Sequence, residues 1–344
     1  MKENFKACLL KLKDRQPLSP EEMTSAMATI MSGAASDADI EAFLTALHEK
    51  GETVSEIAAA ALAMRRNSLK LSKPYSDLLD TCGTGGDAKN TLNVSTLSAI
   101  IAASVGVRVA KHGNRSVSST CGSADLLEML GVVIDLPVSA IGDMIESTGF
   151  GFFFAPKFHP ATRFAMPARK KIGGKTLFNI LGPLSNPAGA AYQVIGVYEE
   201  RLVEIIAQVL LKLGLERALV VYGMDGVDEI SLSSDTKVAE LKDGQIRSYV
   251  TGPEAFGLKR FPLSEFQCAS KEECKQAALK VLKSDEGPKT DLVCLSAGAA
   301  IYTAGRAASI KKGFESAKEF VLSGRAYKKL EDIISFSQRF KTAV

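Results

Sequence analysis

The chain has 344 residues, of which 46% are hydrophobic and 24% are charged. These fractions are typical of globular proteins and exclude a disordered chain, a collagen or a coiled-coil rod, while the length favours two domains. The formal net charge of only +3 disfavours a strongly basic nucleic-acid binder. The charge is uneven, because the segment from Gly305 onward carries nine basic and four acidic side chains and is +5, whereas the rest is −2.

The sequence predicts no membrane segment and no exported, disulfide-bonded fold. No run of 18 apolar residues is present, and the first residues lack the apolar region and cleavage site of a secretory signal. The six cysteines form no C-x-x-C pair and the three histidines are dispersed, so we expect reduced thiols and no dedicated zinc site. A cytoplasmic protein is the expected class.

The first seventy residues predict helices. A capping box with proline at its first helical position spans Ser19–Glu22, and Ser36 and Thr53 begin two further helices. Gly33 and Gly51 are suitable helix ends. The apolar stripes of these helices are one-sided and rich in alanine, so each must be buried against the rest of the chain or against a second copy.

From residue 78 onward, strands and helices alternate, which predicts βαβ units and a parallel sheet. A turn at Asp243-Gly244 predicts one hairpin between residues 238–241 and 246–250. The remainder from Ser270 is expected to be mainly helical. Strands are predicted near residues 78–82, 107–110, 132–134, 150–154, 193–198 and 218–222, and helices near 94–105, 124–130 and 201–213.

A glycine-rich turn over residues 83–87 follows the first strand and predicts a phosphate site, because glycines let backbone amides approach an anion. The next helix begins near residues 93–96, where hydroxyls and free amides face the same space. A merely structural tight turn is the alternative. A dinucleotide fold is disfavoured because the second strand ends in Lys111 instead of an acidic residue. A P-loop is excluded because Arg169 stands where its first glycine is required before Gly174.

The polar segment over residues 111–119 is predicted to be a loop at the carboxyl edge of the sheet, beside the glycine-rich turn. Its cations, imidazole, amide and hydroxyls suit a phosphate crevice, although a solvated loop is the alternative. Asp228 and Glu229 follow a later strand. Adjacent carboxylates suit Mg²⁺, which completes its shell with water and substrate phosphate, and a solvated acidic turn is the alternative.

A third candidate region joins the aromatic strand at residues 150–154 to the segment 155–160 and to Arg169. Aromatic rings followed by a guanidinium would hold a flat anionic ligand, since arginine pairs with carboxylates through two parallel hydrogen bonds. The alternative is that residues 150–154 form a core strand that binds no ligand.

Seven motifs occur in order along the chain: GTGGD, N-x-ST, KHGNRSVSS, GSADLLE, FAPKFHPA, KTLFNILGPLSNP and GVDE. Together they closely resemble the anthranilate phosphoribosyltransferase family over essentially the whole chain. The resemblance implies transfer of phosphoribose from 5-phosphoribosyl 1-pyrophosphate (PRPP) to the amine of anthranilate in tryptophan biosynthesis. It implies a small N-terminal helical domain (residues 1–72, completed by helices around 160–185) and a larger domain (residues 73–344) with a central, mostly parallel β-sheet flanked by helices. It also implies a homodimer through the helical domain.

The resemblance also implies the site residues. Those for PRPP are Gly83, Gly86, Asp87, Thr91, Asn93, Ser95, Thr96, Lys111, His112, Gly113, Asn114, Arg115, Ser116, Val117, Ser118, Ser119 and Ser123. Those for anthranilate are Gly83, Asn114, Ala155, His159, Arg169 and Gly182. Those for Mg²⁺ are Ser95, Asp228 and Glu229.

Three residues are expected to act on the reaction itself. Lys111 would stabilise the charge of the departing pyrophosphate, and Arg169 would orient anthranilate. His112 would either accept the proton of the amine or only position the substrate. One departure from the family pattern is Lys175, which stands where an arginine is usual and supplies a point charge in place of a planar guanidinium.

Two other functions stay open from the sequence. A pyrimidine nucleoside phosphorylase shares the architecture but uses inorganic phosphate. A non-enzymatic nucleic-acid binder of the same fold is supported only by the basic tail, and Asp228, Glu229 and the KHGN motif oppose it.

Overall fold

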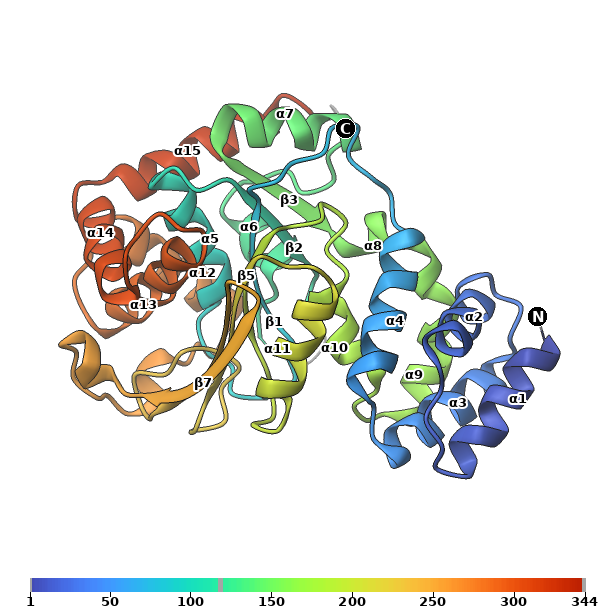
Figure 1. The fold of residues 1–344 in the computed structure, drawn as a ribbon. Coiled ribbons are helices and arrows are strands. Elements are labelled where there is room, and N and C mark those ends of the chain that lie inside the picture. The colour runs from blue at the N-terminus through green and yellow to red at the C-terminus, as the bar shows by residue number, and fades with distance from the viewer. Residues whose placement is uncertain (1, 117–119, 342–344) are drawn as a thin grey trace.

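The computed structural model describes residues 2–116 and 120–341. A group of helices from the N-terminal part lies beside a larger region built on a β-sheet (Figure 1). Two hydrophobic cores fill the described part of the molecule: one includes the C-terminal helices and the other includes the N-terminal helices. None of the helices within the described ranges is both long and apolar enough to cross a membrane. The predicted fold class is therefore confirmed: a small helical region beside a larger region with a mostly parallel sheet.

The helical part begins as the sequence predicted. Ser19 and Thr53 each complete a capping box, and the Ser36 side chain accepts a hydrogen bond from the Asp39 amide. Gly51 ends the third helix with a positive φ of 87°. The helices are α1 (Lys2–Lys13), α2 (Pro20–Met31), α3 (Asp37–Lys50) and α4 (Val54–Arg66).

The apolar stripes of these helices are buried within the chain itself. Met27, Ile30 and Phe43 are fully buried, because helices from the middle of the sequence return to cover them. The returning elements pack on α2, α3 and α4, so the stripes need no second copy to be buried. They are the 3-10 helix η1 (Pro160–Ala165), α9 (Met166–Ile172) and α10 (Leu177–Leu184).

A seven-stranded sheet in the order β3-β2-β1-β4-β5-β6-β7 forms the centre of the larger region. The first five strands are parallel and β6 and β7 are antiparallel. The predicted hairpin is confirmed, and Asp243 and Gly244 both have positive φ, as its tight turn requires. The strands are β1 (Leu79–Gly83), β2 (Val109–Gly113), β3 (Phe150–Phe154), β4 (Tyr192–Gly196), β5 (Arg217–Gly223), β6 (Thr236–Lys242) and β7 (Gln245–Thr251).

Alternate residues of the central strands enter the two cores, as the pleat of a strand requires. Val194 and Leu219 belong to the core shared with the C-terminal helices, whereas Ile195 and Val220 belong to the core shared with the helical part. Helix α11 joins the two regions, because it packs on both α4 and β5. The remaining helices are α5 (Val94–Ser104), α6 (Ser123–Met129), α7 (Val138–Thr148), α8 (Ala155–Phe158), α11 (Leu202–Lys212), α12 (Lys271–Leu282), α13 (Pro288–Thr303), α14 (Ile310–Leu322) and α15 (Arg325–Gln338), with short 3-10 helices η2 (Pro253–Phe256) and η3 (Leu263–Phe266).

Two predicted strands need correction. Residues 132–134 form no strand: the Val133 amide donates to the Ser337 hydroxyl on α15 at 3.0 Å. Strand β2 begins two residues later than predicted and includes Lys111 and His112, which the sequence had placed in a loop. Because side chains alternate along a strand, Lys111 and His112 point to opposite faces of the sheet.

From β1 the chain adds β2 and then β3 on one side of β1 within the sheet. It then crosses over to form β4 on the other side of β1. The carboxyl ends of β1 and β4 therefore form a topological switch point, which is where open α/β sheets bind ligands.

Candidate active site

The glycine-rich turn leaves β1 at this switch point in an unusual backbone conformation. Gly85 and Gly86 have φ of 63° and 79°, and Ala88 and Asn90 follow with φ of 55° and 54°. Left-handed residues in such a sequence turn successive amides outward into a concavity that suits an anion. The Asn93 side chain then accepts from the Thr96 amide at 3.2 Å and begins α5. The glycine-rich turn therefore leads from the end of β1 to the start of α5.

The acidic turn containing Asp228 lies directly on the ends of β1 and β4. A Cβ atom at Gly83 would lie 2.4 Å from Asp228 Oδ2, and one at Gly196 would lie 1.5 Å from the Asp228 carbonyl oxygen. The Gly85 amide donates to Asp228 Oδ2 at 2.7 Å. Glycine is therefore required at both strand ends, because any side chain would displace the carboxylate from the switch point.

The carboxylates at this point repel one another. Burial, then the charge of Asp87, raises the pKa of Asp228 to about 7. Burial, then Asp228, also raises the pKa of Glu229, and Lys111 opposes this effect. Buried carboxylates that repel one another favour a bound cation, because its charge offsets theirs. Among the described residues no three His, Cys, Asp or Glu side chains form a metal-binding group.

Lys111 is buried beside these carboxylates. Its Nζ donates to the Thr81 carbonyl at 2.6 Å and to the Ser95 hydroxyl at 3.3 Å. Burial lowers the pKa of Lys111, while the charges of Asp80 and Glu229 act in the opposite direction. The structure therefore brings Ser95, Lys111 and Glu229 together, although sequence reasoning had placed them in three separate segments.

Asp80, on β1, is a residue that sequence reasoning missed. Its side chain is fully buried and accepts from the His112 amide at 3.1 Å and from Gln193 Nε2 at 3.5 Å. Burial raises its pKa to about 6, and Lys111 partly offsets this effect. A lone carboxylate inside the apolar run LLDTCG was the signal, because carboxylates are rarely buried without a partner.

The polar segment after β2 lies between α6 and the glycine-rich side of the site. The Asn114 carbonyl accepts from the Ala124 amide and the Ser123 hydroxyl, and Asn93 Nδ2 donates to the Cys121 carbonyl at 3.2 Å. Thr91 forms a short bridge with Gln267. Among the predicted residues of this segment, Val117, Ser118 and Ser119 lie outside the described residues.

Two buried histidines lie on the other side of the sheet from Lys111. The rings of His112 and His159 meet edge to face with centroids 5.1 Å apart, and no hydrogen-bond partner in the described chain reaches His112 Nε2. Burial is the first cause that lowers the pKa values of His112 to about 3 and of His159 to about 4. Both rings are therefore neutral at pH 7. Ala155 is the first residue of α8, the short helix that ends directly before His159. The Gly182 backbone lies against His112.

Arg169 lies on α9, in the helical part of the molecule. Its guanidinium lies 5.3 Å from the centre of the Phe178 ring and forms no ion pair with any carboxylate of the described residues. Burial lowers its pKa. Its Nη1 lies 3.7 Å from the Met166 sulfur, and no hydrogen bond joins it to Asn114 among the described residues.

Lys175 connects the helical part to the glycine-rich turn. Its ammonium lies 3.6 Å from the centre of the Tyr198 ring and 3.8 Å from a Glu199 carboxylate oxygen. Its Cε lies 3.8 Å from the position that a Cβ would take at Gly86. The point charge that replaces the usual arginine is therefore within reach of an anion bound at this turn.

Comparisons with known proteins cover both parts of the chain. Residues 6–68 match the model for the glycosyl transferase family, helical bundle domain, and residues 75–327 match that for the glycosyl transferase family, a/b domain. The anthranilate phosphoribosyltransferase of Nitrosomonas europaea is 47% identical over 98% of this chain and 99% of its own length.

Solved structures agree with these matches. The anthranilate phosphoribosyltransferase of Thermus thermophilus superimposes with a TM-score of 0.90 at 44% identity, covering 96% of this chain and 99% of the other. The enzyme from Saccharomyces cerevisiae in complex with PRPP and Mg superimposes with a TM-score of 0.90 at 27% identity, covering 99% of each chain. Since the likeness extends over both regions and nearly the full length, this chain belongs to the anthranilate phosphoribosyltransferase family.

Proposed function

We propose that this chain transfers the phosphoribosyl group of PRPP to the amine of anthranilate, with Mg²⁺, and releases pyrophosphate in tryptophan biosynthesis. The observation that carries the proposal is the switch point itself. There Asp228 and Glu229 lie beside a left-handed glycine turn and opposite the buried ammonium of Lys111. This combination of a cation site and an anion site suits a polyphosphate held together with a metal.

PRPP is bound, in this proposal, by the donors that converge on the switch point. The glycine-rich turn at Gly86 receives its phosphates, and the segments that contain Asn93 and Asn114 border the same site. Ser95, Asp228 and Glu229 hold Mg²⁺, whose charge neutralises that of the departing pyrophosphate. Lys111 adds a second positive charge, because its Nζ lies against Ser95.

Anthranilate is bound on the histidine side, where Arg169 supplies an unpaired guanidinium for its carboxylate. An aryl amine is neutral at pH 7, so it attacks the anomeric carbon without first losing a proton. Orientation is then the main contribution of this part of the site. The low pKa of His112 favours a role in positioning the substrate over a role as a base.

The proposal is tested by mixing the purified protein with PRPP, Mg²⁺ and anthranilate and following anthranilate fluorescence. Loss of fluorescence that requires all three components is the expected result. Activity with inorganic phosphate and a pyrimidine nucleoside, and none with PRPP, would identify a nucleoside phosphorylase instead. A salt-sensitive shift of DNA with no turnover would identify a nucleic-acid binder.

Gly86→Val is expected to weaken PRPP binding much more than it lowers stability. The side chain would enter the space in which the turn presents its amides, and the φ of 79° adds strain for any residue with a Cβ. Isothermal titration calorimetry with PRPP measures the affinity. Gly257→Val is the matched control, because Gly257 has a φ of 80° and nothing within 4 Å of its Cβ position.

Equal PRPP affinity in these two glycine variants would show that the turn has only a structural role. Loss of affinity at Gly86 alone would separate the loss of the anion site from backbone strain, since the two positions share that strain.

We further propose a cytoplasmic homodimer formed through a helical domain of residues 1–72, with the α/β domain over residues 73–344. Leu10 on α1 and Leu62 on α4 support the dimer, because both are large apolar side chains that are exposed on the helices of this domain. Leu10→Glu with Leu62→Glu is expected to yield a monomer of unchanged helix content. Sedimentation velocity of wild type and variant measures this, and a wild-type monomer at micromolar concentration would contradict it.

A further inference from the structure

We propose that Asp125 is a positioning residue for PRPP. Its carboxylate fixes the backbone of the polar segment after β2 at Ser116, and Lys271 holds that carboxylate in place. Because this role concerns PRPP binding, it rests on the proposed function. Asp125 lies in the third position of α6, and its side chain is only 6% exposed. It is one of the few buried carboxylates outside the switch point, and nothing in the proposed mechanism uses it.

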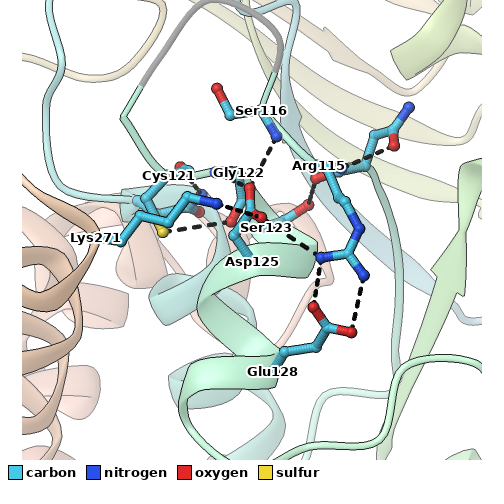
Figure 2. Close-up of polar contacts among 10 residues, drawn as sticks. Arg115, Ser116, Cys121, Gly122, Ser123, Asp125, Glu128 and Lys271 are labelled. Carbon is cyan, nitrogen blue, oxygen red and sulfur yellow. Dashed lines mark hydrogen bonds and ion pairs between the residues drawn. The ribbon is translucent and has the colours of Figure 1, made fainter.

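One oxygen of the Asp125 carboxylate joins the two ends of a loop. Asp125 Oδ2 accepts from the Ser116 amide at 3.0 Å and from the Gly122 amide at 3.0 Å. Figure 2 shows this carboxylate at the start of α6 with Ser116 above it and Lys271 beside it. A single anionic acceptor therefore fixes the backbone directly after Asn114 and Arg115, both of which are candidate PRPP residues.

The other oxygen faces two cations. Asp125 Oδ1 lies 2.9 Å from Lys271 Nζ and 3.5 Å from Arg115 Nη1. Lys271 is the first residue of α12 and comes from 146 positions further along the chain. Arg115 also pairs with Glu128 on the exposed side of α6. The carboxylate is thus satisfied at both oxygens, which is the arrangement that makes a buried charge a geometric constraint.

Close packing shows that this geometry leaves little freedom. A Cβ at Gly122 would lie 2.3 Å from the Ser116 nitrogen, and one at Gly113 would lie 2.1 Å from the Ser123 hydroxyl. The backbone after β2 therefore lies directly on the start of α6, in van der Waals contact. Such an approach needs glycine at both positions and a polar acceptor beneath to satisfy the enclosed amides.

The electrostatic state of Asp125 agrees with this role. Burial alone would raise its pKa, but the amides of Ser116 and Gly122 and the ammonium of Lys271 outweigh that effect and hold the pKa below its usual value. The carboxylate is therefore charged at neutral pH. Its function is to accept hydrogen bonds, not to transfer a proton.

The residues just before α6 are also held from the glycine-rich side. Nδ2 of Asn93, a candidate PRPP residue, donates to the Cys121 carbonyl at 3.2 Å, and the Thr120 hydroxyl donates to Asn90 Oδ1 at 3.2 Å. Ser116 and Gly122 are consequently bound to Asp125, while Thr120 and Cys121 are bound to the glycine-rich side. Loss of the Asp125 carboxylate should therefore weaken PRPP binding, because the backbone of residues 114–116 would no longer be fixed.

The test compares Asp125→Ala, Asp125→Asn and Lys271→Met with a matched control. Asp291→Ala is that control, because Asp291 also lies in the first turn of a helix and pairs with a lysine of a later element, Lys318, at 2.9 Å. It lies on α13, away from the segment after β2. Its loss should lower the thermal midpoint of unfolding by an amount similar to the loss of Asp125.

Asp125→Ala is expected to raise the KM for PRPP, and its dissociation constant in calorimetry, by about tenfold or more, since it removes a charge-assisted acceptor shared by two amides. The KM for anthranilate at saturating PRPP should rise much less than that for PRPP, because among residues 114–116 only Asn114 is also a candidate anthranilate residue. Asp125→Asn should fall between alanine and wild type, because it retains one acceptor oxygen but presents an amide group to Lys271. Lys271→Met should have the smallest effect of the three.

Unchanged PRPP affinity in Asp125→Ala, with the same loss of thermal stability as Asp291→Ala, would overturn the inference and leave Asp125 as a helix cap. Equal increases of both KM values would overturn it as well, since they indicate a general loss of structure. Wild-type protein that binds PRPP without consuming anthranilate would contradict the proposed function. The PRPP affinities of the variants would still decide whether Asp125 positions PRPP. Wild-type protein that binds no PRPP would overturn both.

Discussion

Asp228→Asn combined with Glu229→Gln lowers turnover by roughly two to four orders of magnitude, since a metal that stabilises a leaving group contributes several kcal/mol to the transition state. The two carboxylates lie at the switch point where the glycine turn presents its amides. Without them, Mg²⁺ loses its only proposed protein carboxylates. Steady-state kinetics over a range of Mg²⁺ concentrations measures the effect.

The fold is expected to survive this double change. Both carboxylates have raised pKa values because they are buried, and because Asp87 acts on Asp228 while Asp228 acts on Glu229. Neutral residues of the same shape relieve that repulsion, so the thermal midpoint without metal should not fall. A variant that is at least as stable as wild type but inactive would indicate that the acidic pair is maintained for catalysis and not for stability.

The matched control is Asp235→Asn with Glu254→Gln, which removes the same two charges. These residues pair with Arg260 on the surface beside β6, and their side chains are 42% and 60% exposed. Turnover of the control should remain near that of wild type, because exposed pairs contribute little. Near-normal turnover of the Asp228 and Glu229 variant at ordinary Mg²⁺ concentrations would contradict the metal assignment.

The sequence predicted those parts of the fold that depend on local chemistry. The capping boxes at Ser19 and Thr53, the turn at Asp243-Gly244 and the parallel order of the strands all follow from short patterns, and the structure confirms them. A run of branched residues at 132–134 was misleading, because the same composition suits any buried extended segment. Its amide is satisfied by Ser337, a partner 204 residues away that no local pattern indicates.

The arrangement of the candidate site depends on contacts that the sequence did not predict. Lys111 was predicted to begin a polar loop, yet it lies in the middle of the parallel strand β2 and its Nζ lies against the Ser95 hydroxyl. Asp80 and Asp125 were not selected, since their importance lies in backbone amides that arrive from other segments. Such contacts are products of the tertiary fold, so one sequence read alone offers only the weak hint of a carboxylate in an apolar setting.

Arg169→Ala raises the KM for anthranilate by about ten- to a hundredfold, because the loss of a charge-assisted hydrogen bond costs roughly 1.5–3 kcal/mol. The guanidinium packs on the Phe178 ring and has no carboxylate partner among the described residues, so its charge is available to a ligand. The affinity for PRPP should change little, since the proposed phosphate donors lie at the switch point and Arg169 lies on α9.

Arg163→Ala is the control for this experiment. Arg163 also packs on an aromatic ring, that of Phe164, with 4.8 Å between the guanidinium carbon and the ring centre. It lies in the neighbouring 3-10 helix, so its loss reproduces the change in charge and in packing without touching the proposed carboxylate site. The KM for anthranilate should be normal in this variant.

Arg169→Lys decides between two roles for the guanidinium. If it binds the carboxylate of anthranilate, lysine should recover only part of the affinity, because an ammonium cannot form two parallel hydrogen bonds with a carboxylate. If Arg169 instead only braces α9 against Phe178, the alanine variant should lose thermal stability while its KM for anthranilate remains normal. Unfolding midpoints measured beside the kinetics separate these outcomes, and the second would remove Arg169 from the anthranilate site.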